Sequence, residues 1–201
     1  MKTLALEMST ARGSIALHDG EAALFEASFA ADRKHSGAFF ENVELCLERA
    51  GRPQRIVVGL GPGSYAGVRI AIATALGLRS AINAKLTGIP SICALDVEAG
   101  EYCVVGDARR QSFFFAQVYD RRLIEEPFLE SKRELEARLK KLTIPAFASE
   151  NLPEFPTLKL AWPTAARLAE IAAGSGRENA DAQSLEPIYL RPPHITTPKQ
   201  K

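Results

Sequence analysis

The chain has 201 residues and a formal net charge of +1, with 46% hydrophobic and 24% charged residues. This length suits one domain or two small ones, and the composition is that of an ordinary globular protein without an overall charge that would attract nucleic acid or membranes. An acid at Glu7 argues against a signal peptide, and the best apolar run, residues 70–78, is too short to cross a bilayer. Three cysteines in apolar stretches (Cys46, Cys93 and Cys103) lack metal-ligand spacing, which favours buried reduced thiols in the cytoplasm.

The first half of the chain alternates short apolar strands with helices. We predict strands at residues 3–6, 14–17, 22–29 and 56–60 and from residue 86, and helices at 36–50, 67–82 and 91–97. The first helix is expected to be capped by Ser36 and closed by Gly51, because small polar residues cap helix starts and glycine closes helix ends.

The second half begins with another strand pair and becomes less regular. We predict strands at 102–106 and 113–119, helices at 132–142 and 164–173, and a polar, disordered tail at 196–201.

One pattern occurs twice, about a hundred residues apart: a strand, an acid, a polar turn with arginine and a second strand. The acids are Glu7 and Asp107. This repetition favours a duplicated α/β domain, and the alternative is that two unrelated hairpins look alike.

A glycine-rich loop, GLGPGSYAGVRIA (residues 59–71), connects an apolar strand to a helix. No lysine follows Gly67, so the loop is not a Walker A cradle, and its glycine spacing is one residue too long for a dinucleotide fingerprint. A tight strand-to-helix turn with close backbone approach is the competing interpretation. The residues assigned to this turn are Gly61, Pro62, Gly63, Ser64, Gly67 and Arg69.

The helix after this loop is apolar around its whole circumference. One arc consists almost entirely of small residues (Ala66, Ile70, Ala73, Gly77 and Ala81), and the opposite arc carries Val68, Ile72, Ala75 and Leu78. A helix of this kind is covered on both sides, and the sheet can cover only one of them. The sequence therefore predicts that a partner covers the other.

The motif GPGSYAGVRIAIATALGL resembles the glycine signature of the TsaB (YeaZ) family, and the segments HSGAFFENVELCLERAG, DARRQSFFFAQVYD and EPIYLRP extend the resemblance over residues 1–192. The resemblance implies an α/β fold of the actin/Hsp70/sugar-kinase (ASKHA) class, with duplicated ribonuclease-H-like subdomains and mixed sheets. The expected boundaries are 1–100 for the first subdomain, 101–192 for a reduced second subdomain and 193–201 for a flexible tail.

The resemblance also implies a function. TsaB-like proteins are non-catalytic partners of TsaD, the transferase that forms threonylcarbamoyladenosine beside the tRNA anticodon, and a TsaE-type ATPase joins them. It implies a heterodimer with TsaD, a homodimer when the chain is alone, contact with tRNA only through the complex, and no membrane. It implies no cofactor of its own, with ATP or ADP at the shared interface. The implied interface, or core beneath it, comprises Phe39, Phe40, Val43, Leu47, Val68, Ile72, Ala73, Ala75, Leu76 and Gly77.

Two features depart from the family: Glu7 replaces the usual aspartate, and the second subdomain is short for a complete nucleotide pocket. The alternative function is a small ASKHA phosphotransferase. Its magnesium carboxylates would be Glu7 and Asp107, and its phosphate turn would comprise Ser9, Thr10 and Arg12.

Other functions find less support in the sequence. TsaD-like proteins bind metal through two histidines four residues apart, whereas His35 is followed by Phe39, and neither His18 nor His194 has ligand-like spacing. No catalytic or metal site is therefore predicted. A free-standing tRNA-binding module would need a basic stripe with interleaved aromatics. The nearest candidates are turn arginines: Arg109, Arg110, Arg121 and Arg122.

Overall fold

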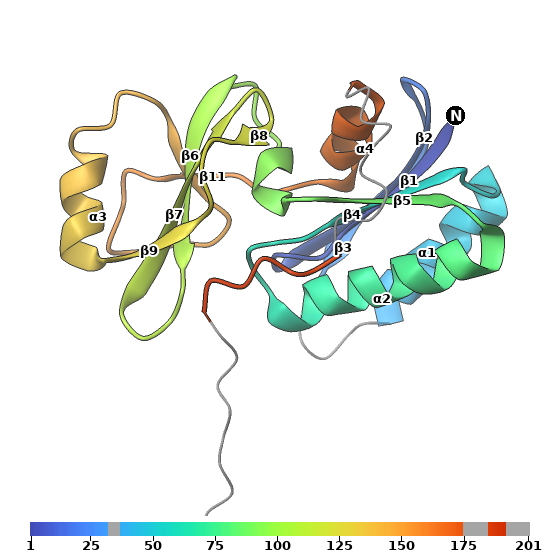
Figure 1. The fold of residues 1–201 in the computed structure, drawn as a ribbon, viewed down its shortest axis with the longest axis horizontal. Coiled ribbons are helices and arrows are strands. Elements are labelled where there is room, and N and C mark those ends of the chain that lie inside the picture. The colour runs from blue at the N-terminus through green and yellow to red at the C-terminus, as the bar shows by residue number, and fades with distance from the viewer. Residues whose placement is uncertain (32–36, 175–184, 192–201) are drawn as a thin grey trace, which may run out of the picture.

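The structure, a computed structural model, describes residues 1–31, 37–174 and 185–191 (Figure 1). The expected cap Ser36, the histidines His35 and His194, and the tail 193–201 lie outside these residues. Two sheets form the framework. The first contains β1 (Lys2–Glu7), β2 (Arg12–Asp19), β3 (Ala22–Ala30), β4 (Arg55–Gly59) and β5 (Lys85–Ile89), in the order β3-β2-β1-β4-β5.

The first sheet is mixed, and helices cover both of its faces. β1 pairs antiparallel with β2 and parallel with β4, which places Leu4 opposite both Leu17 and Ile56. Helices α1 (Gly37–Ala50) and α2 (Tyr65–Ile82) lie on one face, and α4 (Ala165–Gly174) lies on the other (Figure 1). Burial on both faces explains the apolar centres of these strands, residues 4–6 in β1 and 56–58 in β4.

The second sheet repeats the plan of the first. β6 (Glu101–Asp107) pairs antiparallel with β7 (Ser112–Tyr119) and parallel with β10 (Ala146–Ala148). Its other strands are β8 (Arg122–Leu123), β9 (Phe128–Ser131) and β11 (Lys159–Leu160), and α3 (Lys132–Leu139) packs against β7 and β9. Glu7 ends β1 and Asp107 ends β6, so the repeated sequence pattern is a duplication of topology.

Three apolar clusters form the core. One lies between the first sheet and α1 and α2, one joins α4 and the short helix η1 (Ser91–Ala94) to both sheets, and one lies between the second sheet and α3. Although α4 follows the second sheet in the chain, it packs on the first. Ser14 Oγ accepts the Ala165 N–H at 2.9 Å, and Arg55 Nη1 donates to the Ala172 carbonyl at 2.6 Å.

The prediction missed strands β8 to β11, which are two to four residues long, and it extended α3 three residues beyond Leu139. The three cysteines are buried, as predicted, and no disulfide joins them in the described structure. Burial raises the pKa of Cys46 to about 11 and that of Cys103 to about 12. Helix α2 has 18 residues and a mean hydropathy of 1.2, which by length and composition alone would allow it to cross a membrane. Its inner face packs on the first sheet, so here it serves as a helix of the folded domain.

Candidate functional site

The structure separates the ten predicted interface residues into core and surface. Five of them lie in the core beneath α1 and α2: Phe39, Val43, Val68, Ile72 and Ala75. Four others are exposed, namely Phe40, Ala73, Leu76 and Gly77, and Leu47 is half-buried. The buried residues hold the two helices on the sheet, and the exposed ones leave an apolar surface outside.

This surface, which we call the outer helix face, consists of Phe40 and Leu47 from α1 and the exposed small arc and Leu76 from α2. Phe40 is 50% exposed and Leu76 43%. A Cβ added at Gly77 would have no atom within 4 Å, so the middle of the α2 surface is open. Apolar exposure on two helices that cover the same face of the sheet is typical of a contact surface. Glu41, Glu44 and Glu48 on α1 and Arg69 and Arg79 on α2 are also exposed.

The glycine loop is pressed against the turn between β1 and β2. A Cβ at Gly63 would lie 2.0 Å from the Ser9 carbonyl oxygen, and one at Gly67 would lie 2.1 Å from the Met8 carbonyl oxygen. Ser64 donates its N–H to the Ser9 carbonyl at 2.6 Å and caps α2 by accepting the Gly67 N–H at 3.2 Å. These glycines therefore make room for the chain's own backbone, which favours the tight-turn interpretation over a phosphate cradle.

The start of the loop is tied to η1 and to the last described segment. Gly61, with φ of +86°, accepts the Ser91 N–H at 2.8 Å and donates to Ser91 Oγ at 3.0 Å, and it precedes Pro62 through a cis peptide bond. Ile188 donates its N–H to the Leu60 carbonyl at 2.8 Å. The loop, which leads into α2, is therefore hydrogen-bonded at its start to both η1 and the segment 185–191.

Glu7 lies behind this loop and is completely buried. Its Oε1 accepts the Ser9 N–H at 2.6 Å, and within the described part of the chain no partner reaches Oε2 at hydrogen-bond distance. Burial raises the pKa of Glu7, although its hydrogen bonds to Ser9 oppose the rise. A Cβ at Gly59 would lie 1.9 Å from Oε2, so the strand backbone seals the carboxyl group.

The other predicted phosphate-turn residues are engaged locally. Thr10 Oγ1 bonds both backbone groups of Arg12, at 3.0 and 3.1 Å, and the Arg12 guanidinium lies 3.5 Å from the centroid of the Trp162 ring. Asp107 pairs with Arg109 at 2.9 Å. The structure therefore brings Glu7 and Ser9 to the glycine loop, while Asp107 belongs to the second sheet. Within residues 1–31, 37–174 and 185–191, no three His, Cys, Asp or Glu side chains gather as a metal site.

Sequence analysis missed an exposed aromatic pair. Tyr65 begins α2 and Tyr189 belongs to the last described segment, and their ring centroids lie 5.7 Å apart. Arg121, which the sequence places among the turn arginines, donates to the Leu95 and Val97 carbonyls at 2.7 and 2.6 Å. The sequence gives no signal for either contact, because the partners are far apart in the chain.

Residues 29–175 match the profile of the family described as "TsaD: tRNA N6-adenosine threonylcarbamoyltransferase". An uncharacterized protein of Mycobacterium leprae is 38% identical over 66 residues, which are 32% of this chain and 18% of that protein. An uncharacterized protein of Mycobacterium tuberculosis is 28% identical over 145 residues, 69% of this chain and 64% of that protein. The chain thus spans less than two thirds of the length of these relatives.

Two solved structures share the fold. YeaZ from Pseudomonas aeruginosa superposes with a TM-score of 0.71 at 20% identity, covering 94% of this chain and 99% of that one. A protein described as similar to peptidase YeaZ, also from P. aeruginosa, gives the same TM-score and coverage at 23% identity. The predicted ASKHA fold is therefore confirmed. The chain belongs to the family described as TsaD, tRNA N6-adenosine threonylcarbamoyltransferase, and it has the fold of YeaZ (TsaB), the branch that its sequence motifs predict.

Proposed function

We propose that this chain is the non-catalytic, TsaB-type subunit of a tRNA threonylcarbamoyladenosine-forming complex. It acts by binding a TsaD-type transferase through the outer helix face. The observation that carries the proposal is the exposed apolar surface of the two helices. Phe40 on α1 and Leu76 on α2 are exposed, and the small exposed residues Ala73 and Gly77 let a partner helix approach α2 closely.

The remaining assignments follow from the same proposal. A TsaE-type ATPase joins the complex, tRNA reaches the chain through the complex, and two copies pair through the outer helix face when no transferase is present. The chain has no cofactor of its own, and ATP or ADP binds where the subunits meet. The complex works in the cytoplasm.

The phosphotransferase alternative is disfavoured by the surroundings of its key residues. Glu7 is sealed behind Gly59 and has a raised pKa, which is the opposite of what a magnesium ligand needs. The carbonyl groups of Met8 and Ser9 occupy the space beside Gly67 and Gly63.

Reconstitution tests the proposal. Transfer of the threonylcarbamoyl group to tRNA by a TsaD-type enzyme with its ATPase should depend on this chain, and the chain alone should neither transfer the group nor hydrolyse ATP. Phosphoryl transfer by the purified chain that disappears in Glu7→Ala or Asp107→Asn would instead establish the phosphotransferase.

A further inference from the structure

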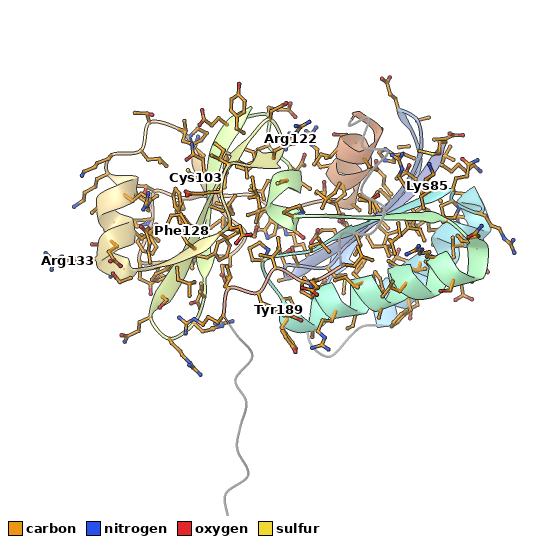
Figure 2. All side chains as sticks on the ribbon, in the orientation of Figure 1. Lys85, Cys103, Arg122, Phe128, Arg133 and Tyr189 are labelled. Carbon is orange, nitrogen blue, oxygen red and sulfur yellow. The ribbon has the colours of Figure 1, made fainter. Side chains whose placement is uncertain are left out.

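A second exposed surface lies beyond the amino-terminal end of α2, where three separate segments meet. We call it the tyrosine–arginine surface. Its exposed residues are Tyr65, Arg69, Arg109, Arg110 and Tyr189, and the half-buried Arg191 borders them. Tyr65 is 56% exposed and Tyr189 48%. Their rings are inclined by 38°, and Figure 2 shows Tyr189 beside the first turn of α2.

Two hydrogen bonds hold the three segments together, one between backbone groups and one from a side chain. Ile188 is bonded to Leu60 just before the glycine loop, and Arg191 Nη2 donates to the Arg109 carbonyl at 3.2 Å. The segment from 185 to 191 therefore connects the start of α2 to the turn between β6 and β7. Tyrosines and arginines that are far apart in the sequence become neighbours through this connection.

The turn between β6 and β7 has an unusual backbone. Arg109, Arg110 and Gln111 have φ values of 64°, 55° and 59°, in the left-handed region that favours glycine. Tight turns of β-hairpins require positive φ values, so this conformation closes the hairpin and leaves Arg109 and Arg110 exposed at its tip. Arg110 makes no hydrogen bond or ion pair with any residue the structure describes, so its side chain is available to a ligand.

The charges of this surface are largely unpaired. Arg109 is balanced by Asp107, but no carboxylate among the described residues pairs with Arg69, Arg110 or Arg191. The Arg69 guanidinium instead lies 4.9 Å from the centroid of the Tyr65 ring and bonds the Tyr65 hydroxyl. Glu186 on the last segment is also exposed and adds a negative charge, so the surface is not uniformly positive. It offers two aromatic rings with individual arginines beside them.

We propose that the tyrosine–arginine surface binds a single-stranded or loop segment of RNA. Exposed bases stack on Tyr65 and Tyr189, and the arginines contact the flanking phosphates. This is the usual chemistry of single-strand recognition, in which aromatic rings hold bases and Arg follows the backbone. The choice of RNA as the nucleic acid rests on the proposed function. Direct binding of RNA by this chain goes beyond that function, in which tRNA reaches the chain through the complex.

Fluorescence anisotropy with a labelled tRNA hairpin loop tests the proposal, using the full chain alone and saturated with the transferase. Tyr189→Ala should weaken RNA binding by about tenfold or more, and Tyr189→Phe, which keeps the ring, should stay within about twofold of wild type. Arg110→Ala should weaken binding and lower the slope of log affinity against log salt by about 0.7.

The chain provides matched controls at the other end of β7. Tyr119 is 60% exposed and Arg122 is exposed, and Figure 2 shows Arg122 away from Tyr189. Tyr119→Ala and Arg122→Ala should bind RNA like wild type. The proposal is overturned if RNA binds in neither format, if a fully paired RNA duplex binds equally well, or if the Tyr189 and Arg110 variants match these controls.

A protein partner on this surface would give a different pattern. Tyr189→Ala would then weaken transferase binding and leave RNA affinity unchanged, which also overturns the proposal. Failure of the proposed function can be distinguished from failure of RNA binding. A chain that binds no transferase can still bind RNA when it is measured alone, and that affinity should still depend on Tyr189.

Discussion

At the scale of single residues, two glycines of α2 have opposite surroundings. A Cβ at Gly67 would lie 2.1 Å from the Met8 carbonyl oxygen, and a Cβ at Gly77 would have no neighbour within 4 Å. We expect Gly67→Ala to lower the free energy of unfolding by about 1–3 kcal/mol, because the turn backbone must move. Gly77→Ala should raise it by about 0.5–1 kcal/mol, the gain of alanine over glycine inside a helix. Urea denaturation measures both, and equal effects would contradict the close packing of the loop.

Glu7 should make stability depend on pH in an unusual direction. Its pKa in the folded chain is raised by burial above the ordinary value of 4.5, so the folded state binds the proton more tightly than the unfolded state. The associated stability is therefore present at low pH and is lost as pH rises from 4.5 through the folded pKa.

Glu7→Gln removes this titration while keeping the shape of the side chain. Thermal unfolding of both proteins at about pH 5 and about pH 8 should show the variant gaining stability relative to wild type at the higher pH. Parallel melting temperatures across this range would mean that Glu7 ionises as easily in the folded chain as in the unfolded one.

At the scale of elements, adjacent phenylalanines of α1 have different roles. Phe39 is fully buried between α1 and the first sheet, and Phe40 lies half exposed with its ring centroid 5.3 Å from that of Phe39. Phe39→Ala should cost about 3–5 kcal/mol of stability. Phe40→Ala should change stability by no more than about 0.5 kcal/mol and weaken transferase binding by at least about 1 kcal/mol.

Denaturation and titration calorimetry separate the two effects. A Phe40→Ala chain that binds the transferase like wild type would remove α1 from the outer helix face. A Phe39→Ala chain of normal stability would contradict the assignment of Phe39 to the core.

The helices and long strands could be predicted because their signals are local. The apolar circumference of α2 indicates two covers, and the structure shows that Val68, Ala71 and Ala75 meet the sheet while Ala73 and Gly77 do not. Strands β8 to β11 carry no such signal, since two to four residues cannot show a period. The sequence indicates which two helices carry the outer helix face. Which of their residues are exposed depends on how the helices pack on the sheet, and only the structure shows that.

At the scale of the whole molecule, the two sheets share a topology, but corresponding residues in them have different surroundings. Glu7 and Asp107 hold equivalent places at the ends of β1 and β6, so the sequence suggested a paired carboxylate site. Their surroundings differ, because Glu7 lies beneath Gly59 while Asp107 holds Arg109. The Tyr65–Tyr189 contact and the return of α4 to the first sheet join distant parts of the chain, which local patterns do not reveal.

Binding of the transferase to the outer helix face is tested most directly by the affinity of Ala73→Arg for a TsaD-type transferase, measured by titration calorimetry beside Ala137→Arg. Both alanines are exposed on helices, α2 and α3 respectively, so both variants should fold with melting temperatures close to wild type. Ala73→Arg places an unpaired cation where the partner helix approaches, and affinity should fall by about a hundredfold or more, with Ala137→Arg unchanged. A folded Ala73→Arg chain that binds the transferase with wild-type affinity would show that the transferase does not bind the outer helix face.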